Sequence, residues 1–337
     1  MRRNRQTAQV SLAFLIASTI TLGMLALTIV LVGQSFRGME SAKITAASAT
    51  ARQLAVSVDD RIRAITDPPS TALAVLSHDP LAIADTLQQR LVRLPVVADI
   101  LDSSDIVSAV YAGYANGDFF LLRKIRSSGA MQFPDAPTNA QYLLQSITRA
   151  ADGKSQSMWH FYDAGRTLLE RRTPSDYHFD PRDRGWYELA DASSNTKLTA
   201  PYVFFTTGET GLTLSRRQAI AKGMDGNTVF GIDVTVTDLS TQLAELRQTP
   251  GTRIAIVNAE GSPLAHTGPD ATHNGAISDS AEPQELYDDA ITAVLDHDSS
   301  QVSPEQVNSF TTENRDWYGM TEPLESLDRE NLKIAVA

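Results

Sequence analysis

The hydrophobic pattern begins with one long apolar segment. Val10 to Val32 is apolar almost throughout, and no charged residue occurs between Gln6 and Phe36. A helix of this length, at about 1.5 Å per residue, spans roughly 30 Å, which is the thickness of the hydrocarbon core of a bilayer. Such a helix satisfies its own backbone hydrogen bonds, as lipid requires. We therefore predict a transmembrane helix over residues 10–33.

Charges beside this segment predict its orientation. Arginines occupy positions 2, 3 and 5, and positive charge favours the cytoplasmic side. Residues 1–9 would then be cytoplasmic, and the rest of the chain would lie in the periplasm, held to the bacterial inner membrane by a single pass. A cleaved signal peptide is the alternative, but its apolar part is shorter and small residues follow it. Arg37 and Glu40 follow here at helical spacing, which favours an uncleaved anchor.

Helical periodicity continues beyond the membrane segment. Apolar residues recur at steps of three and four and predict one long helix over residues 34–66, which Asp67-Pro68-Pro69 would end. Its apolar stripe would pack on its own domain or on a second copy of the chain, so we expect a homodimer through this stalk. Shorter helices are predicted at 70–78 and 80–101, so that residues 34–104 form the stalk and its packing helices.

Strand signals replace helical ones near residue 105. Asn116-Gly117-Asp118 and Asp163-Ala164-Gly165 are turn signals, each between two apolar runs, and each predicts a hairpin. Together the runs predict one antiparallel sheet with helices packed on it, a membrane-distal module over residues 105–236. The strands of this module are predicted at 106–111, 119–123, 158–162, 167–172, 202–206, 213–219 and 228–236.

A second and smaller module is predicted over residues 237–337. Thr237-Asp238 should cap a helix at 239–247, and Glu260-Gly261 should make a tight turn. A second helix is predicted at 285–295, between a strand at 253–258 and strands after 307. The last residues, 333–337, have the pattern of a strand cut short, so we expect this module to be truncated. The fold class is therefore α+β, with an N-terminal transmembrane helix, a long stalk helix and two PAS-like antiparallel-sheet modules.

Composition and motifs exclude several functions. The net charge of -11 argues against nucleic acid as a partner, because phosphate binding needs a basic face. The absence of cysteine excludes disulfides and thiol chemistry. The six histidines lack metal-ligand spacing, and the chain has no phosphate-binding glycine loop. We therefore predict no catalytic residue, no metal and no cofactor in this chain.

The densest polar and aromatic stretch starts with a helix signal. Asp180 is suited to an N-cap, Pro181 to the first turn, and Asp183 to a capping box. Arg184 and Trp186 would then lie at the start of a helix, where free N–H groups and a guanidinium favour an anion.

This stretch has a competing interpretation. Its aromatic residues would simply pack the helix on the sheet, and its arginines would pair with nearby acids.

The same stretch, FDPRDRGWYELA, resembles the signature of double Cache domains, the extracytoplasmic sensors of bacterial chemoreceptors, histidine kinases and cyclases. The resemblance covers residues 35–337. The segments YAGYANGDFFLLR and PYVFFTTGETGLTLSRR are most similar to Cache sensors fused to class III adenylate or guanylate cyclases of Gram-negative bacteria. This resemblance implies a second membrane helix and a cytoplasmic cyclase beyond residue 337.

The resemblance also implies a ligand site in the distal module, for an amino acid or another small carboxylate. Arg184 and Trp186 would face a carboxylate, and Asp233 would receive an ammonium group. The resemblance further assigns Tyr187 and Tyr202 to the pocket, with either Tyr111 or Tyr114. Gly185 departs from the family pattern, in which proline is common. From the residues alone, Asp233 is equally a cap at the end of a strand.

These observations predict that the chain is the sensing region of a transmembrane receptor that controls an adenylate or guanylate cyclase, which is a phosphorus–oxygen lyase. We predict no enzyme activity in this chain itself. The alternatives within this class are the sensor of a chemoreceptor, a histidine kinase or a diguanylate cyclase. Outside it, the alternatives are a membrane-anchored periplasmic enzyme and an adhesion or assembly module that acts through the stalk.

Overall fold

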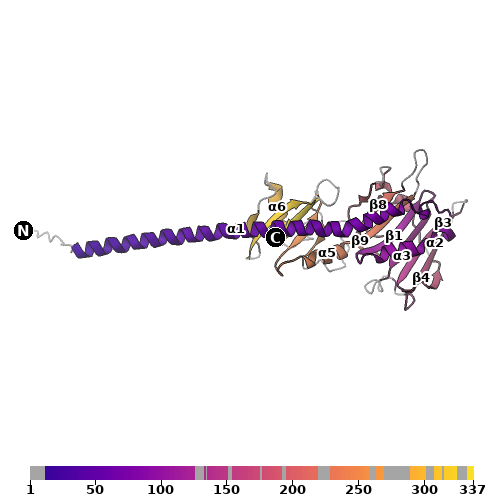
Figure 1. The fold of residues 1–337 in the computed structure, drawn as a ribbon, viewed down its shortest axis with the longest axis horizontal. Helices are drawn as coiled ribbons and strands as arrows, with labels where there is room; N and C mark the ends of the chain where they lie inside the picture. The colour runs from indigo at the N-terminus through magenta and orange to yellow at the C-terminus, as the bar shows by residue number, and fades with distance from the viewer. Residues whose placement is uncertain are drawn as a thin grey trace, which may run out of the picture.

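One helix runs along the whole molecule. The computed structural model describes residues 12–125, 133, 135–150, 154–174, 177–191, 195–218, 228–258, 261, 263–268, 289–300, 307–312, 315–324 and 332–337. Helix α1 (Leu12–Leu76) projects beyond two sheet modules that lie side by side along its C-terminal half (Figure 1). Over the described residues, α1 is the one helix long and apolar enough to cross a membrane, and its most apolar window is uncovered by protein.

The prediction that Asp67-Pro68-Pro69 ends this helix is wrong, because α1 continues through both prolines to Leu76. A proline inside a helix removes a backbone hydrogen bond and is costly. Leu73 and Leu76 are fully buried, however, and they prolong the stripe of Val58 and Ile62 that packs on the sheets. This burial holds the last turns in place, so the predicted helix at 70–78 is part of α1.

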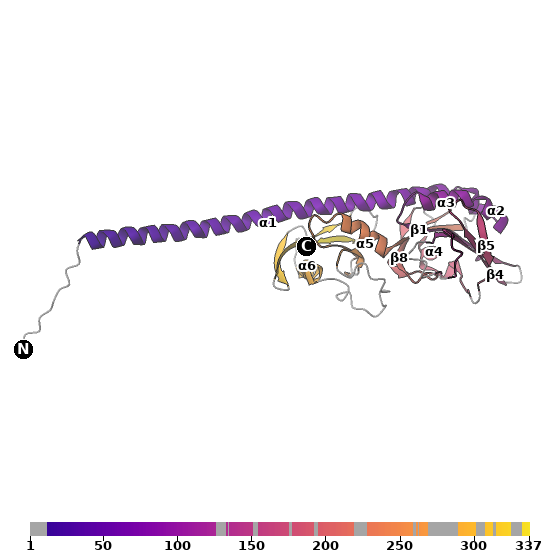
Figure 2. The ribbon, with the colours of Figure 1, turned by 90° about the horizontal axis from the view of Figure 1, so that it is seen from below.

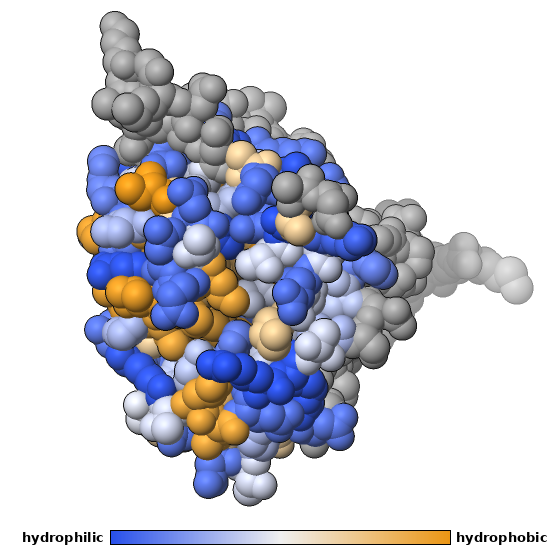
Figure 3. Space-filling view, turned by 90° about the vertical axis from the view of Figure 1, so that its right-hand side faces the viewer, coloured by the Kyte–Doolittle hydropathy of each residue, from blue (hydrophilic) through white to orange (hydrophobic). Residues whose placement is uncertain are grey.

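Three short helices follow α1 at the distal end, namely η1 (Pro80–Ile83), α2 (Leu87–Val92) and α3 (Leu94–Asp102). Asp79 caps η1 by accepting a hydrogen bond from the Leu81 N–H at 2.8 Å, and Thr86 forms a capping box with Gln89 at the start of α2. The distal end has apolar patches within a mostly hydrophilic surface (Figure 3).

The distal module is a nine-stranded sheet in the order β5-β4-β3-β2-β1-β9-β8-β6, with β7 paired to β8. Both predicted hairpins are confirmed, as β1–β2 and β4–β5. The strand predicted at 202–206 is shorter than expected, because a turn begins at Phe204, and Ala219 lies outside the described residues. The strands are β1 (Val107–Tyr114), β2 (Phe119–Lys124), β3 (Tyr142–Arg149), β4 (Ser155–Tyr162), β5 (Leu168–Arg172), β6 (Lys197–Leu198), β7 (Tyr202–Val203), β8 (Thr210–Arg217) and β9 (Thr228–Thr235).

The two faces of this sheet have different coverings. Alternate residues of a strand point to opposite faces, so Val110 and Ala112 of β1 join the core beneath α1, while Ala109 and Tyr111 join an aromatic cluster on the other side. Helices α1 and α3 lie on one side of the sheet and α4 (Gly185–Leu189) on the other (Figure 2). The face away from α1 is therefore the one available for a site.

The proximal module follows directly on β9. Its helix α5 (Val236–Glu245) begins earlier than predicted, because Thr235 and not Thr237-Asp238 is the cap. The Thr235 hydroxyl accepts from the Asp238 N–H at 3.0 Å and donates to the Asp238 carboxylate at 2.7 Å.

Its five-stranded sheet has the order β11-β10-β14-β13-β12. The predicted strand at the end of the chain is confirmed as β14, which lies in the middle of this sheet. Residues 285–288 of the predicted helix and Glu260 of the predicted turn lie outside the described residues. The remaining elements are β10 (Ile254–Val257), β11 (Pro263–His266), α6 (Asp289–Ser300), β12 (Asn308–Thr312), β13 (Arg315–Pro323) and β14 (Lys333–Val336).

A buried ion pair joins the distal helices to the β1–β2 turn. The Arg90 guanidinium contacts the Asp118 carboxylate at 2.8 Å, and both side chains are nearly inaccessible, at 1% and 4% exposure. Arg90 also donates to the Ala84 carbonyl at 3.0 Å and lies over the Tyr114 ring at 3.8 Å. Breaking such a pair leaves a desolvated charge without a partner, which is costly.

We predict that Arg90→Met lowers the free energy of unfolding by about 3–5 kcal/mol, because it strands the Asp118 carboxylate in the core. Denaturant unfolding of the purified protein, followed by tryptophan fluorescence, measures this loss. The matched control is Arg93→Met, since Arg93 pairs with Asp79 nearer the surface. This variant should lower the free energy of unfolding by clearly less. Equal losses for the two variants would contradict the prediction.

Candidate ligand-binding site

A cavity of about 540 Å³ lies on the face of the distal sheet that points away from α1. Its floor is formed by β1, β2 and β9, and its walls by η3 (Pro181–Asp183), α4 and residues 199–206. Cavities of this size accommodate small molecules. Its lining residues are Tyr111, Phe119, Leu121, Arg123, Tyr177, Phe179, Asp183, Arg184, Gly185, Trp186, Leu189, Thr199, Ala200, Pro201, Tyr202, Val203, Phe204, Phe205, Thr206 and Asp233.

Strand register places two opposite charges on the floor. Arg123 of β2 and Asp233 of β9 are both paired with Ala109 of β1, and Asp233 is paired on its other side with Thr213 of β8. Directly paired residues point to the same face. Arg123 and Asp233 therefore flank the small Ala109 side chain.

Asp233 is buried and held by hydroxyl groups. Its Oδ1 accepts from the Tyr111 hydroxyl and from the Thr213 hydroxyl, both at 2.6 Å, and the Tyr202 hydroxyl lies 2.7 Å from that of Thr213. Burial raises the pKa of Asp233 to about 6, although the two hydroxyl donors and the nearby Arg123 oppose this rise. Burial and the Asp233 charge also raise the pKa of Tyr111 and of Tyr202 above the ordinary value.

A glycine makes room for this arrangement. A Cβ atom at Gly231 would lie 2.1 Å from the Tyr111 ring, so only glycine at this position lets the tyrosine lie flat across β9 and reach Asp233.

The Arg184 guanidinium lies against two aromatic rings that also contact each other. Its guanidinium carbon is 4.7 Å from the centre of the Phe179 ring and 4.6 Å from that of Phe205. Its buried Nε has no hydrogen-bond partner, and Arg184 makes no ion pair with any described residue. Stacking holds the guanidinium in place while leaving its donors available.

Arg123 is a lining residue that the sequence analysis missed. It is 6% exposed, and its buried Nε has no partner among the described atoms. Burial lowers the pKa of this guanidinium, and the Asp233 carboxylate partly offsets the effect. The predicted β1–β2 hairpin contained the signal, since alternation puts Phe119, Leu121 and Arg123 on one face of β2.

The structure brings together five of the seven residues predicted to bind a ligand, namely Tyr111, Arg184, Trp186, Tyr202 and Asp233. Trp186 packs edge-on against the Tyr111 ring, with a centroid distance of 4.8 Å. The other two residues lie outside the lining. Tyr187 lies beneath the Arg217 guanidinium, and Tyr114 is on the opposite face of the sheet, where its hydroxyl donates to the Leu81 carbonyl at 2.9 Å.

The signature segment differs in detail from the predicted helix. It forms a single 3₁₀ turn, η3 (Pro181–Asp183), and α4 starts only after Arg184, whose backbone is extended. The Asp180 side chain accepts from the Arg182 N–H at 3.0 Å, as an N-cap does. No capping box is present among the described contacts of this turn, because the extended backbone at Arg184 ends the turn at Asp183.

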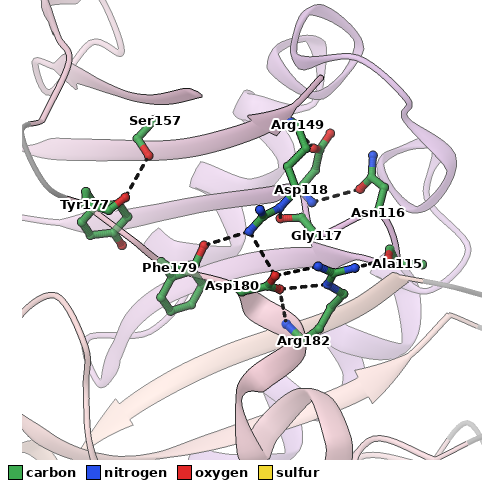
Figure 4. Close-up of polar contacts among 10 residues, drawn as sticks. All are labelled: Ala115, Asn116, Gly117, Asp118, Arg149, Ser157, Tyr177, Phe179, Asp180 and Arg182. Carbon is green, nitrogen blue, oxygen red and sulfur yellow. Dashed lines mark hydrogen bonds and ion pairs between the residues drawn. The ribbon is translucent and has the colours of Figure 1, made fainter. Parts of the chain in front are cut away.

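Asp180 also ties the segment to the sheet. Its carboxylate contacts the Arg149 guanidinium of β3 at 3.1 Å, and Arg149 donates further to the Gly117 carbonyl at 3.0 Å and the Phe179 carbonyl at 3.3 Å (Figure 4). The Asp118 side chain accepts from the Arg149 N–H at 2.7 Å. Hydrogen bonds from Arg182 and the nearby Arg149 charge hold the pKa of Asp180 below its ordinary value, although burial opposes this. The cavity wall is thereby connected to the buried Arg90–Asp118 pair.

Comparison with curated proteins finds relatives among bacterial signalling proteins. Adenylate cyclase 1 of Rhizobium meliloti (strain 1021) is 27% identical over 255 residues, which cover 74% of this chain and 38% of the cyclase. The methyl-accepting chemotaxis protein PscA of Pseudomonas syringae pv. tomato is 33% identical over 93 residues, or 28% of this chain and 14% of PscA. The chain thus spans well under half the length of these relatives. No protein-family model matches it.

Solved structures identify the fold. The ligand-binding domain of the Pseudomonas fluorescens chemoreceptor CtaA, in complex with L-serine, superposes with a TM-score of 0.52 at 18% identity, covering 86% of this chain and 95% of that domain. The sensory domain of the Campylobacter jejuni chemoreceptor Tlp3, with isoleucine bound, superposes with a TM-score of 0.54 at 14% identity, covering 88% and 94%. The chain therefore has the fold of a double Cache (dCache) sensor domain, as the sequence resemblance predicted.

We predict that the Asp233 carboxylate makes stability depend on pH. The folded state holds this proton up to about pH 6, whereas the unfolded state releases it near 3.8. Between these values the folded state binds more protons, so the stability from this group is lost as pH rises. At about 1.4 kcal/mol per pKa unit the loss amounts to about 3 kcal/mol.

Asp233→Asn isolates this effect, since it keeps the size and removes the titration. Unfolding curves of both proteins at several pH values give the free energy of unfolding of each. The wild-type value minus the variant value should fall from pH 4 to pH 7. A difference that stays level or rises would show that the folded-state pKa is not raised.

Proposed function

We propose that this chain is the extracytoplasmic sensing region of a transmembrane signalling receptor, which binds an amino acid or another small carboxylate in the distal cavity. The observation that carries the proposal is Arg184, a half-buried residue whose guanidinium lies against two phenyl rings, with a buried Nε and no ion-pair partner among the described residues. A desolvated cation favours an anionic partner.

The rest of the cavity supports a small polar ligand. Trp186 and Tyr202 provide flat walls, and Asp233 with Tyr111 provides acceptors that suit an ammonium group. The solved CtaA and Tlp3 domains, which have the same fold, are in complex with L-serine and with isoleucine. Tyr187 and Tyr114 lie outside the lining, so we propose that they support the pocket rather than contact the ligand.

We propose that α1 anchors this region in the inner membrane, with the N-terminus in the cytoplasm. The boundary between the two modules would lie at residue 236/237, and a second copy of the chain would pack on the stalk. The same helix packs on both sheets, so a ligand that prefers one arrangement of the distal module would bias the stalk.

The output we propose is an adenylate or guanylate cyclase, by similarity to adenylate cyclase 1 of Rhizobium meliloti over most of this chain. A chemoreceptor output is the second candidate, and the similarity to PscA favours it.

We predict that a small carboxylate raises the melting temperature of the purified, detergent-solubilised chain, and that Arg184→Met weakens its binding about 10- to 100-fold, the loss expected for a hydrogen bond to a charged group. Thermal-shift screening with amino acids and organic acids, followed by calorimetric titration, measures both effects.

The matched control is Arg182→Met. Arg182 lies two positions earlier, is paired with Asp180 and is absent from the cavity lining, so its loss should leave affinity nearly unchanged. Ligand binding that Arg184→Met and Asp233→Ala both leave intact would disprove this site.

A further inference from the structure

The cavity contains two arginines where one carboxylate of a ligand needs only one. Arg123 and Arg184 both line it, and neither makes an ion pair with a described residue. Each has a buried Nε without a hydrogen-bond partner. Arg184 belongs to the signature segment, whereas Arg123 comes from β2 on the cavity floor.

The two guanidinium groups act on the same part of the cavity. The Tyr177 hydroxyl lies 3.0 Å from that of Thr206, and both arginines act to lower the pKa of this phenol, although burial raises it overall. Two like charges in one partly desolvated space repel each other and lack the solvation they would have in water. An anion with two charged ends would relieve both.

The acidic side chains nearby do not neutralise this pair. Asp233 lies across Ala109 from Arg123, and its Oδ1 is already bound by two hydroxyls. Glu209 influences Arg123 electrostatically, but it is absent from the cavity lining and makes no described ion pair with either arginine. Asp183 lines the cavity from an exposed position.

We propose that the ligand of this cavity carries two acid groups, one bound by Arg184 and the second by Arg123. This inference rests on the proposed sensor function and specifies its ligand class as a small dicarboxylate, with or without an amino group. A ligand with one carboxylate would leave one guanidinium unpaired, as it is without ligand, and would lack the binding energy of a second charge-assisted hydrogen bond. Arg123 is then the residue that determines specificity.

Asp233 distinguishes the two kinds of dicarboxylate. An ammonium group would pair with the ionised Asp233 carboxylate, so an acidic amino acid has a partner for each of its three charges. A dicarboxylic acid without nitrogen would instead meet Asp233 in its protonated form. The affinity of the succinate dianion, after correction for its own protonation, should therefore rise as pH falls below about 6, while that of L-glutamate should not.

The test is calorimetric titration of the full chain in nanodiscs with L-glutamate, L-aspartate and succinate, against L-glutamine, L-serine and L-isoleucine. L-glutamine is the closest comparison, because it replaces one carboxylate of L-glutamate with an amide of the same size. We expect one of the dicarboxylates to bind at least about 10-fold more tightly than every monocarboxylate.

Variants of Arg123 test the residue itself. Arg123→Met should weaken dicarboxylate binding about 10- to 100-fold and remove the preference over L-glutamine, whereas Arg123→Lys should keep part of it. Arg171→Met is the control, since Arg171 is exposed on β5 and absent from the cavity lining. Glu209→Gln should strengthen dicarboxylate binding if Glu209 has any effect, because it removes a competing negative charge.

The outcomes separate this inference from the function on which it rests. The inference would be overturned if monocarboxylates bind as tightly as dicarboxylates, or if folded Arg123→Met keeps the preference for dicarboxylates. Neither result would contradict the proposed carboxylate sensor. Failure of all six probes to bind would overturn both. If Arg123→Met does not fold, the comparison of the three dicarboxylates with the three monocarboxylates on the wild-type chain still decides the question.

Discussion

The constraint on which this domain depends is that a charge taken out of water must find a partner. At the distal end the fold meets it internally, because Arg90 is paired with Asp118 and both are enclosed. In the cavity, two charged groups lack such a partner among the described residues. Arg123 is held at a buried position by the sheet, and the half-buried Arg184 is held by aromatic contacts, with donors left unused by the described residues. These unused donors support the anion affinity that we propose for the cavity.

The polar network behind the cavity keeps these charges in position. The Arg149 side chain connects the β1–β2 turn to the Asp180 carboxylate (Figure 4), and Asp118 links this turn to Arg90. The cavity wall is therefore attached to the helix-covered side of the sheet through a chain of charged contacts. A preformed arrangement of this kind lowers the ordering cost that a ligand must meet on binding.

The sequence could predict the parts of the fold that have local signals. Asn116-Gly117-Asp118 predicted a hairpin, and the signature around Trp186 predicted the cavity wall, because turn chemistry and motif spacing are local properties. Strand β3 was missed because its first six residues are all buried, so it has no alternation to detect. The continuation of α1 through Pro68 and Pro69 depends on burial against the sheets. Arg123 was missed because its position beside Ala109 and Asp233 depends on the register of three strands, which only the strand pairing in the structure reveals.

The strands that form the cavity floor are also the strands on which α1 packs. In β9, Asp233 faces the cavity while Ile232 and Val234 face the core beneath α1, so a ligand at Asp233 is one residue away from the helix side. A small apolar void of about 20 Å³ lies where Ile62 of α1 meets Val234 and Ile256 of the two sheets. Interiors are close-packed, and a gap forfeits contacts that would fix its neighbours. At the junction of the stalk helix with both modules, α1 therefore lacks some of the contacts that would fix it. In the sensor function that we propose, a change in the distal sheet would act on α1 at this junction.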